Sequence, residues 1–568
     1  MLTNDTEKLY PSAKTLVKEC IASRIHAKDA SVYDFSDEAR ACAEHYMGWT
    51  DLASNPPYPL EEIQEFADEI IAQGLKTVVL IGQGGSTQAP MTITKYNKAD
   101  SSLIKFRTID SDSPVRVRAM LSEINPKTTL FVISSKSGGT IEPRLMLRAV
   151  RDAVAEEMSE EEFVKHLVAI TDPGSDLERQ AREEGWRKVF LGEPSVGGRF
   201  SALTVFGLVP AALVGIDLKE FIAHGAEAER ACSEDAIDNP AICLAAFLYD
   251  NYLARRNKFS FLTQKRGRVL GLWIEQLVAE SLGKHGQGIL PNIEIDSLLL
   301  TKDPGDRTVV MYQTKNDLWD ERHNFEMSLS YIDPAIPRAN YRINSVEELP
   351  EHFVMWEYAI AMCGYLMKVC PFDQPDVASA KEAVLDILRN GHPEPDFVQD
   401  FFGDVHMGQA EVRLSPCFKD CTDILSALRA LMNSIQPGDY FALNAFLPFT
   451  GEGRREALEA IRHGVADKRG VASCLEVGPR YLHSTGQLQK GGPNSGVFLI
   501  LSADELKDIP LGQEAESLGT LAKAQAEGDL LTLAARGRRC VHLHLPDNSS
   551  VTIRALSEII NSVLETRA

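Results

Sequence analysis

Residues 129–143 read Thr-Leu-Phe-Val-Ile-Ser-Ser-Lys-Ser-Gly-Gly-Thr-Ile-Glu-Pro, and this stretch decides the fold of the 568-residue chain. Its first five residues form an apolar run of strand length. From residue 142 onward, apolar residues recur at helical spacing, so a helix follows. Between the two elements stand four hydroxyl groups, one ammonium group and two glycines. The stretch therefore predicts a strand–loop–helix unit with a polar loop at the strand's end.

This loop is typical of a site for a phosphate monoester. A turn from strand to helix exposes backbone N–H groups and the positive end of the helix dipole. The hydroxyls and Lys136 add donors and positive charge, and the glycines let the backbone approach an anion closely. The alternative is an ordinary capped turn, but one Ser or Thr would suffice for a cap. The chain has no Walker A spacing, so a small phosphorylated ligand is expected rather than a nucleoside triphosphate.

Further strands and helices alternate around this unit. Strands are expected at 76–81, 104–109, 167–171 and 188–191, with helices between them. The strand at 76–81 is apolar without alternation, as in a parallel sheet covered on both faces. The order predicts a doubly wound sheet, whose ligands bind at the carboxyl ends of strands. Two loops meet there, so the predicted phosphate-binding residues are Gly85, Ser86, Ser135, Lys136, Ser137 and Thr140.

A second series of strands and helices begins near residue 258. Its strands are expected at 258–263, 308–313, 440–446, 471–477, 497–501 and 541–545. We therefore expect N-terminal helices with a first domain over 1–257, and a second domain with insertions over 258–568. Residues 1–50 read as surface helices. Residues 390–417 are poor in pattern and read as an insertion.

Charge and cysteine content exclude several classes of function. A net charge of −22 repels nucleic acid and anionic membranes, so neither is an expected partner. The ten cysteines are scattered without a CxxC pair, which indicates reduced thiols in a cytoplasm and predicts no metal site. The chain opens without a signal peptide and has no apolar run of membrane-spanning length. A cytoplasmic location is therefore expected.

Four motifs together resemble those of the phosphoglucose isomerases, a family built from two sugar-isomerase domains. The motifs are Gly-Gly-Ser at 84–86, the loop at 135–140, Val-Gly-Gly-Arg-Phe-Ser at 196–201, and Gln276 with Glu-Ser-Leu-Gly-Lys at 280–284. Residues 371–377 and 478–493 look closest to the isomerase half of bifunctional transaldolase–isomerase fusions. No transaldolase half fits ahead of residue 76, so a stand-alone isomerase of that branch is expected.

The resemblance implies two doubly wound sugar-isomerase domains with mainly parallel sheets flanked by helices. It also implies interconversion of glucose 6-phosphate and fructose 6-phosphate without a metal or other cofactor, in a homodimer. Proton transfer between C2 and C1 needs a base, and the cis-enediolate needs a positive group. Glu280 matches the family's base and shares a helix face with Gln276. Arg199 matches the enediolate-stabilising arginine; it stands at a predicted helix start, where its charge opposes the helix dipole.

Ring opening needs a further acid or base, and here the chain departs from the family pattern. The family has a histidine after the glutamate and a lysine near the C-terminus. In this chain His483 and Lys490 lie seven residues apart in one late segment. His483 is the candidate for ring opening, and His285 is the alternative. Lys490 would suit the ring-oxygen end of the substrate, although a lysine beside Gly-Gly-Pro is most often a solvated loop residue.

Two other functions remain open from the sequence. The same loops would serve an isomerase of another aldose or ketose phosphate, because the phosphate site is better specified than the pocket around C3 and C4. A non-catalytic sugar-phosphate sensor would use the same domains without needing Glu280. No helix-turn-helix or basic patch is evident to complete such a regulator.

Overall fold

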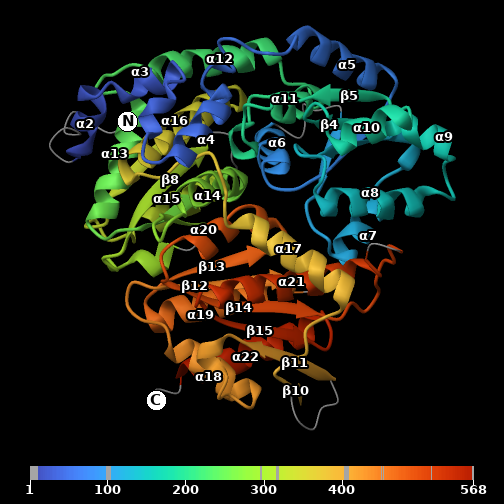
Figure 1. Ribbon diagram of the computed structural model, residues 1–568, viewed down its shortest axis with the longest axis vertical. Coiled ribbons are helices and arrows are strands. Elements are labelled where there is room, and N and C mark those ends of the chain that lie inside the picture. The colour runs from blue at the N-terminus through green and yellow to red at the C-terminus, as the bar shows by residue number, and fades with distance from the viewer. Residues whose placement is uncertain are drawn as a thin grey trace. The chain divides into compact units, whose positions relative to one another are not determined.

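The computed structural model describes residues 10–97, 104–293, 297–314, 319–401, 408–449, 451, 453–512 and 515–565. The chain divides into two compact units, one of residues 1–110 and 123–373, the other of residues 111–122 and 374–568. Their helices and strands are labelled in Figure 1. Two β-sheets belong to the first unit and one to the second.

The first sheet is parallel throughout and has the strand order β2–β1–β3–β4–β5. Its central strands are β1 and β3, and their last residues, Gly82 and Ser134, are partners in the register. The loops that follow these two strands therefore start side by side. The strand bounds are β1 (Thr77–Gly82), β2 (Lys105–Ile109), β3 (Thr129–Ser134), β4 (Leu167–Thr171) and β5 (Lys188–Leu191).

Helices cover both faces of this sheet. Val78, Leu80 and Val132 belong to a core that also holds apolar residues of α5 (Leu60–Ala72), α6 (Gly85–Tyr96) and α11 (Val205–Leu213). The alternating strand residues point to the opposite face. There α8 (Ile141–Val154) packs on β1 and β3, and α10 (Asp176–Glu183) packs on β4 and β5. The short helix α9 (Glu160–Phe163) lies between them in the chain.

The second sheet of this unit is also parallel, in the order β7–β6–β8–β9. Its strands are β6 (Lys258–Thr263), β7 (Leu290–Asn292), β8 (Arg307–Thr314) and β9 (Arg338–Ile343), and α15 (Trp319–Leu329) precedes β9. Helix α14 (Arg268–Leu282) follows β6 and packs against α6 and α16 (Leu349–Met367). Helices α12 (Leu218–Cys232) and α13 (Pro240–Leu253) pack on α16. One apolar core therefore joins both sheets of the unit.

The N-terminal region is helical, as predicted. It forms α2 (Ser12–Lys18), α3 (Ile21–His26) and α4 (Asp37–Tyr46), while residues 1–9 lie outside the described part of the chain. These helices are more than a surface layer, because Leu16 and Ile21 are fully buried in the unit's core. None of the described helices is both long and apolar enough to cross a membrane.

The second unit contains a six-stranded mixed sheet in the order β10–β11–β15–β14–β12–β13. The last four strands of that order are parallel, and β10 and β11 add an antiparallel edge. The strands are β10 (Phe397–Asp400), β11 (Gln409–Leu414), β12 (Tyr440–Phe446), β13 (Ala472–Val477), β14 (Gly496–Ala503) and β15 (Arg539–Leu545).

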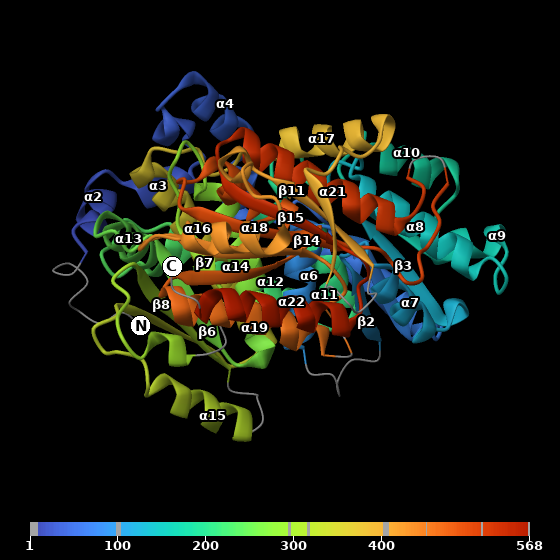
Figure 2. The ribbon, with the colours of Figure 1, turned by 90° about the horizontal axis from the view of Figure 1, so that it is seen from below.

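Helices also cover both faces of this sheet. Figure 2 shows α17 (Val377–Asn390) and α21 (Leu518–Ala535) on one side of β14 and β15, and α19 (Arg454–Arg469) and α22 (Ser550–Glu565) on the other. Helix α18 (Ile424–Asn433) packs on α22. Helices α7 (Pro114–Ser122) and α20 (Gly486–Gly491) complete the unit.

The predicted fold class is confirmed, since the chain is built from mainly parallel sheets flanked by helices. The number of sheets differs, because residues 258–568 supply two sheets. Strand β6 begins at the expected boundary after residue 257, whereas the compact units separate after residue 373. The division into domains at 257 stays a prediction. The expected insertion at 390–417 supplies β10 and β11, and its residues 402–407 lie outside the described chain.

The buried imidazole of His352 on α16 should make the first unit sensitive to acid. Its Nδ1 lies 3.1 Å from the Tyr312 hydroxyl, and burial lowers the pKa of His352 to about 4. The unfolded chain binds a proton near pH 6.5, so stability is present above that pH and lost as the pH falls towards 4. Lowering the pH from 7 to 5 should remove about 2 kcal/mol of unfolding free energy through this group.

Urea unfolding at both pH values, followed by circular dichroism, measures this loss. The variant His352→Gln should lose less stability than wild type over the interval, and His285→Gln, in an exposed turn, should behave as wild type. Equal losses in wild type and His352→Gln would contradict the assignment.

Candidate functional site

The turn between β1 and α6 brings two glycine-rich loops into contact. Gly84 precedes α6 with φ +56° and ψ −132°, a conformation that suits glycine. A Cβ on Gly85 would lie 2.1 Å from the carbonyl oxygen of Gly198, so only glycine fits there. The Ser134 hydroxyl, at the end of β3, donates to the Ser86 carbonyl at 3.2 Å. Three of the predicted motifs therefore meet at the carboxyl edge of the first sheet.

The hydroxyls of the loop at 135–140 are not used to cap α8. Thr140 occupies the N-cap position, yet within the described chain its side chain makes no capping hydrogen bond. Ser135 is only 5% exposed, and its Oγ has no hydrogen-bond partner among the described residues. An unpartnered buried hydroxyl is costly unless a ligand or water meets it. The arrangement favours a ligand site over the ordinary capped turn.

Lys136 already has a counter-ion. Its ammonium pairs with Asp172, which follows β4, and donates to the Glu193 carbonyl at 3.4 Å. Both side chains are mostly buried, and burial raises the pKa of Asp172. Sequence reasoning missed this partner, because no pattern links residues 136 and 172. Ser137 is exposed, and its hydroxyl accepts from the Gly139 N–H at 3.3 Å.

A pocket of about 270 Å³ opens beside this loop in the first unit. Ser135, Gly139 and Thr140 line one part of it, and Asp176 and Gln180 of α10 line another. Arg144, in the first turn of α8, also lines it and was not singled out by the sequence. The pocket thus combines loop hydroxyls with a guanidinium at a helix N-terminus.

Glu280 and Gln276 point the same way from α14, as their spacing predicts. Gln276 Nε2 donates to Glu280 Oε2 at 3.1 Å. The Arg199 Nη1 lies 3.7 Å from the same oxygen. Glu280 is 7% exposed and Arg199 is 3% exposed, while Gln276 Oε1 has no partner among the described residues. A buried carboxylate, a guanidinium and an amide therefore meet within one unit.

Arg199 is fixed by hydrogen bonds from several directions. Its Nε donates to the Ser281 hydroxyl at 2.8 Å, and its Nη2 donates to the carbonyls of Pro371 at 2.6 Å and Asp373 at 2.9 Å. The expectation that Arg199 opposes a helix dipole was wrong. Arg199 lies in the separate 3-10 helix η5 (Gly198–Phe200), and α11 starts later with Thr204 as its cap. Its position is explained by the carbonyls it binds.

Lys284 is a second buried cation near this group. Its Nζ donates to the Cys370 carbonyl at 2.5 Å and lies 2.5 Å from Asp373 Oδ1. Burial lowers the pKa of Lys284, and the nearby charge of Arg199 lowers it further. The sequence placed Lys284 in a motif without assigning it a role. His285, the alternative for ring opening, is exposed in the turn that follows α14.

His483 and Lys490 lie in the second unit, and their contacts are described within that unit. His483 is half-buried at the end of the 3-10 helix η10 (Arg480–His483). Lys490 is 2% exposed, and its Nζ lies 2.5 Å from Asp529 Oδ1. Tyr481 donates to the other Asp529 oxygen at 2.6 Å. Lys490 is thus no solvated loop residue, and the catalytic roles of His483 and Lys490 stay predictions.

Comparison with known proteins connects the motifs to one family. Residues 61–294 match the family model of phosphoglucose isomerase. The glucose-6-phosphate isomerase of Carboxydothermus hydrogenoformans is 33% identical over 407 residues, covering 61% of this chain and 86% of that protein. The glucose-6-phosphate isomerase of Parasynechococcus marenigrum is 33% identical over 401 residues, covering 62% and 72% respectively.

Two crystal structures share the fold. A hypothetical protein of Thermus thermophilus aligns with a TM-score of 0.56 and 22% identity, covering 66% of this chain and 96% of its own. A glucose-6-phosphate isomerase of Chlamydia trachomatis aligns with a TM-score of 0.51 and 21% identity, covering 64% and 78%. The family model spans both phosphate-type loops, Arg199, Gln276 and Glu280, but it ends before residues 478–493. The resemblance of that late segment to the fusion isomerases stays a prediction.

Removing one member of the buried pair of Lys490 and Asp529 should destabilise the second unit strongly. Asp529→Asn leaves an almost fully buried ammonium without its carboxylate, so the free energy of unfolding should fall by about 3–5 kcal/mol. Asp467→Asn is the matched control, because Asp467 pairs with Lys468 where both side chains are at least half exposed. The control should change stability by less than about 1 kcal/mol. Urea midpoints that agree between the two variants would contradict the structural role.

Proposed function

Because the chain belongs to the phosphoglucose isomerase family and is an aldose–ketose isomerase acting on a sugar phosphate, we propose that it interconverts glucose 6-phosphate and fructose 6-phosphate through an enediolate. One observation carries the proposal. The buried Glu280 carboxylate, held by Gln276, lies 3.7 Å from the guanidinium of Arg199 in the unit that bears the phosphate-type loops. A base, an electrophile and an anchor for phosphate are therefore available together.

Glu280 is the proposed base. From open-chain glucose 6-phosphate it takes the proton on C2, and the electrons of that C–H bond form a C1–C2 double bond. The carbonyl oxygen on C1 becomes the enediolate oxygen. Moving the hydroxyl proton of C2 to this oxygen and returning the proton from Glu280 to C1 gives fructose 6-phosphate. One carboxylate serves both carbons because they are neighbours, and the hydrogen bond from Gln276 fixes its direction.

Arg199 is the proposed group that stabilises the enediolate. Its guanidinium is held by Ser281, Pro371 and Asp373 before any substrate arrives. A positive group that is fixed in advance needs no reorganisation as negative charge develops. Burial also removes competing water, which strengthens its effect on a nearby oxyanion.

The loop at 135–140 is the proposed phosphate anchor. Ser135 offers a buried hydroxyl without a partner among the described residues, and Thr140 offers one that is not used as a cap. The N-terminal N–H groups of α8 point at the same loop. Lys136 contributes less than a free ammonium would, since Asp172 shares its charge. Binding would therefore rest on the loop hydroxyls, the N–H groups at the start of α8 and the Arg144 guanidinium that lines the pocket.

Ring opening is the least defined step. We propose His483 for it, with His285 as the alternative, and Lys490 at the ring-oxygen end as the family pattern suggests. We also propose that the protein is a cytoplasmic homodimer. A coupled assay with glucose 6-phosphate, fructose 6-phosphate and mannose 6-phosphate tests the substrate. Faster turnover of another aldose or ketose phosphate would favour the alternative isomerase.

Glu280→Gln should lower kcat by about 100-fold to 10,000-fold, because the amide cannot accept the C2 proton. The variant Glu275→Gln is a matched control on the same helix with the same 7% exposure, and it should retain activity within a few-fold. In heavy water, wild-type product should carry deuterium at C1 or C2, and Glu280→Gln should lose this exchange. Wild-type turnover by Glu280→Gln would remove Glu280 as the base.

Ser135→Ala should weaken binding of the substrate's phosphate group. We expect KM for the sugar phosphate and the inhibition constant of inorganic phosphate each to rise about tenfold, since one hydrogen bond to a charged group is lost. The value of kcat should change little. Ser54→Ala, which removes an exposed hydroxyl elsewhere in the same unit, is the control. An unchanged phosphate inhibition constant in Ser135→Ala would place the phosphate elsewhere.

A further inference from the structure

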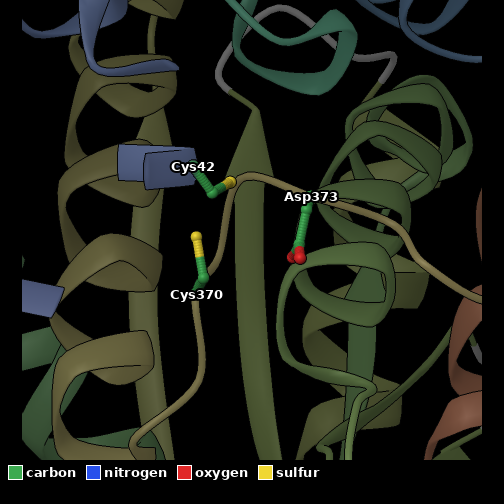
Figure 3. A group of neighbouring side chains, drawn as sticks. All are labelled: Cys42, Cys370 and Asp373. Atoms are coloured by element: carbon green, nitrogen blue, oxygen red, sulfur yellow. The ribbon is translucent and has the colours of Figure 1, made fainter. Parts of the chain in front are cut away.

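Two cysteines meet next to the segment that holds Arg199. Cys42 lies on α4, and Cys370 follows α16. Their sulfur atoms and a carboxylate oxygen of Asp373 all lie within 4.8 Å of one another. Figure 3 shows the Cys370 sulfur pointing towards Cys42. Cys42 is half-buried and Cys370 is buried, so a small reagent reaches the pair from the side of Cys42.

Two buried cations, Lys284 and Arg199, lie near the pair, together with the Asp373 carboxylate. The Lys284 ammonium binds the Cys370 carbonyl and one Asp373 oxygen, each at 2.5 Å. The Arg199 guanidinium binds the carbonyls of Pro371 and Asp373. A divalent metal ion at Cys42, Cys370 and Asp373 would be repelled by these two buried cations. The Lys284 charge favours a thiolate on Cys370, while burial and the Asp373 carboxylate oppose it. The site suits thiol chemistry better than metal binding.

The two thiols differ in character. The Cys42 thiol donates towards the Cys370 sulfur and lowers the pKa of Cys370, and Lys284 lowers it further. The same contact raises the pKa of Cys42. The shifts make Cys370 the more readily ionised thiol of two whose sulfurs lie within 4.8 Å of each other. This is the arrangement of an oxidisable cysteine beside a resolving cysteine.

We propose that Cys42 and Cys370 form a reversible disulfide when the enzyme meets hydrogen peroxide. The Cys370 thiolate attacks one peroxide oxygen and the O–O bond breaks. Hydroxide departs as the leaving group, and Cys370 becomes a sulfenic acid. The Cys42 thiol then attacks this sulfur, the S–O bond breaks, and the S–S bond forms. The proton of Cys42 and one from solvent convert the two hydroxides to water. Two thiols are oxidised and one peroxide is reduced, and a dithiol reductant reverses the reaction.

The disulfide would act on the site through the backbone of residues 370–373, a step that rests on the proposed role of Arg199. Bond formation brings the sulfurs to about 2 Å, closer than two unbonded sulfurs can lie. A shift of Cys370 would be passed to its neighbours Pro371 and Asp373, whose carbonyls hold Arg199. A displacement of about 1 Å at a catalytic group can lower turnover by up to about a hundredfold.

Peptide mapping of the full chain tests the disulfide without reference to activity. After peroxide treatment and alkylation of the remaining thiols, mass spectrometry should find the Cys42 and Cys370 peptides linked, with two hydrogens lost, and dithiothreitol should release them. Cys42→Ser and Cys370→Ser should each abolish the link. Peroxide treatment that leaves both cysteines alkylated, or that oxidises Cys370 without a link in wild type, would overturn the proposal.

Isomerase assays of the same samples test the consequence. Peroxide should lower the kcat of wild type about tenfold, with recovery in dithiothreitol, while Cys42→Ser keeps its untreated activity. Cys417→Ser, an exposed cysteine of the other unit, should respond as wild type does. A linked protein with full activity would overturn the coupling to Arg199. Untreated wild type that fails to turn over glucose 6-phosphate would instead overturn the proposed function and leave the linkage result untouched.

Discussion

The first unit depends on the buried guanidinium of Arg199. A charge with 3% exposure is expensive to desolvate unless it is both paired and hydrogen-bonded. Here Glu280 supplies the opposite charge, and Ser281 and the carbonyls of Pro371 and Asp373 supply acceptors. Arg199 follows the first sheet, Glu280 follows β6 of the second, and the carbonyls follow α16. One side chain thus joins three distant segments, and loss of any one partner leaves the charge under-compensated.

The same constraint organises the second unit on a larger scale. One face of its sheet is apolar under α19 and α22, but the face under α21 carries charged and polar groups. The register places Arg413 beside His542 and Ser502 beside His544 on that face. On α21, Glu527 forms an ion pair with Arg413 of β11, and Asp529 forms an ion pair with Lys490 of α20. Loss of either pair would leave a buried charge uncompensated, so we expect these pairs to restrict how α21 packs on the sheet.

The sequence predicted those strands and helices that are marked by the pattern of their own residues. Strands β4, β6 and β12 were predicted with their observed bounds. A mostly apolar run marks β4 and β12 as strands buried on both faces, while β6 is marked by its alternating aromatic residues. Strands β9 and β10 were missed because exposed residues alternate along them, and β7 has only three residues. Partners such as Asp172 for Lys136 were also missed. Contacts between distant segments are set by topology, and a backbone carbonyl that binds Arg199 leaves no trace in the sequence.

The geometry around Glu280 connects the fold's electrostatics to the proposed reaction. In the resting site, the charge of Arg199 is shared with the Glu280 carboxylate. If Glu280 takes the C2 proton, that carboxylate becomes neutral in the same step that creates the enediolate. The guanidinium then faces a new negative charge in place of the old one, while its bonds to backbone carbonyls stay unchanged. In the proposed reaction the fixed guanidinium would thus meet the charge that develops in the transition state, and the phosphate site would supply orientation.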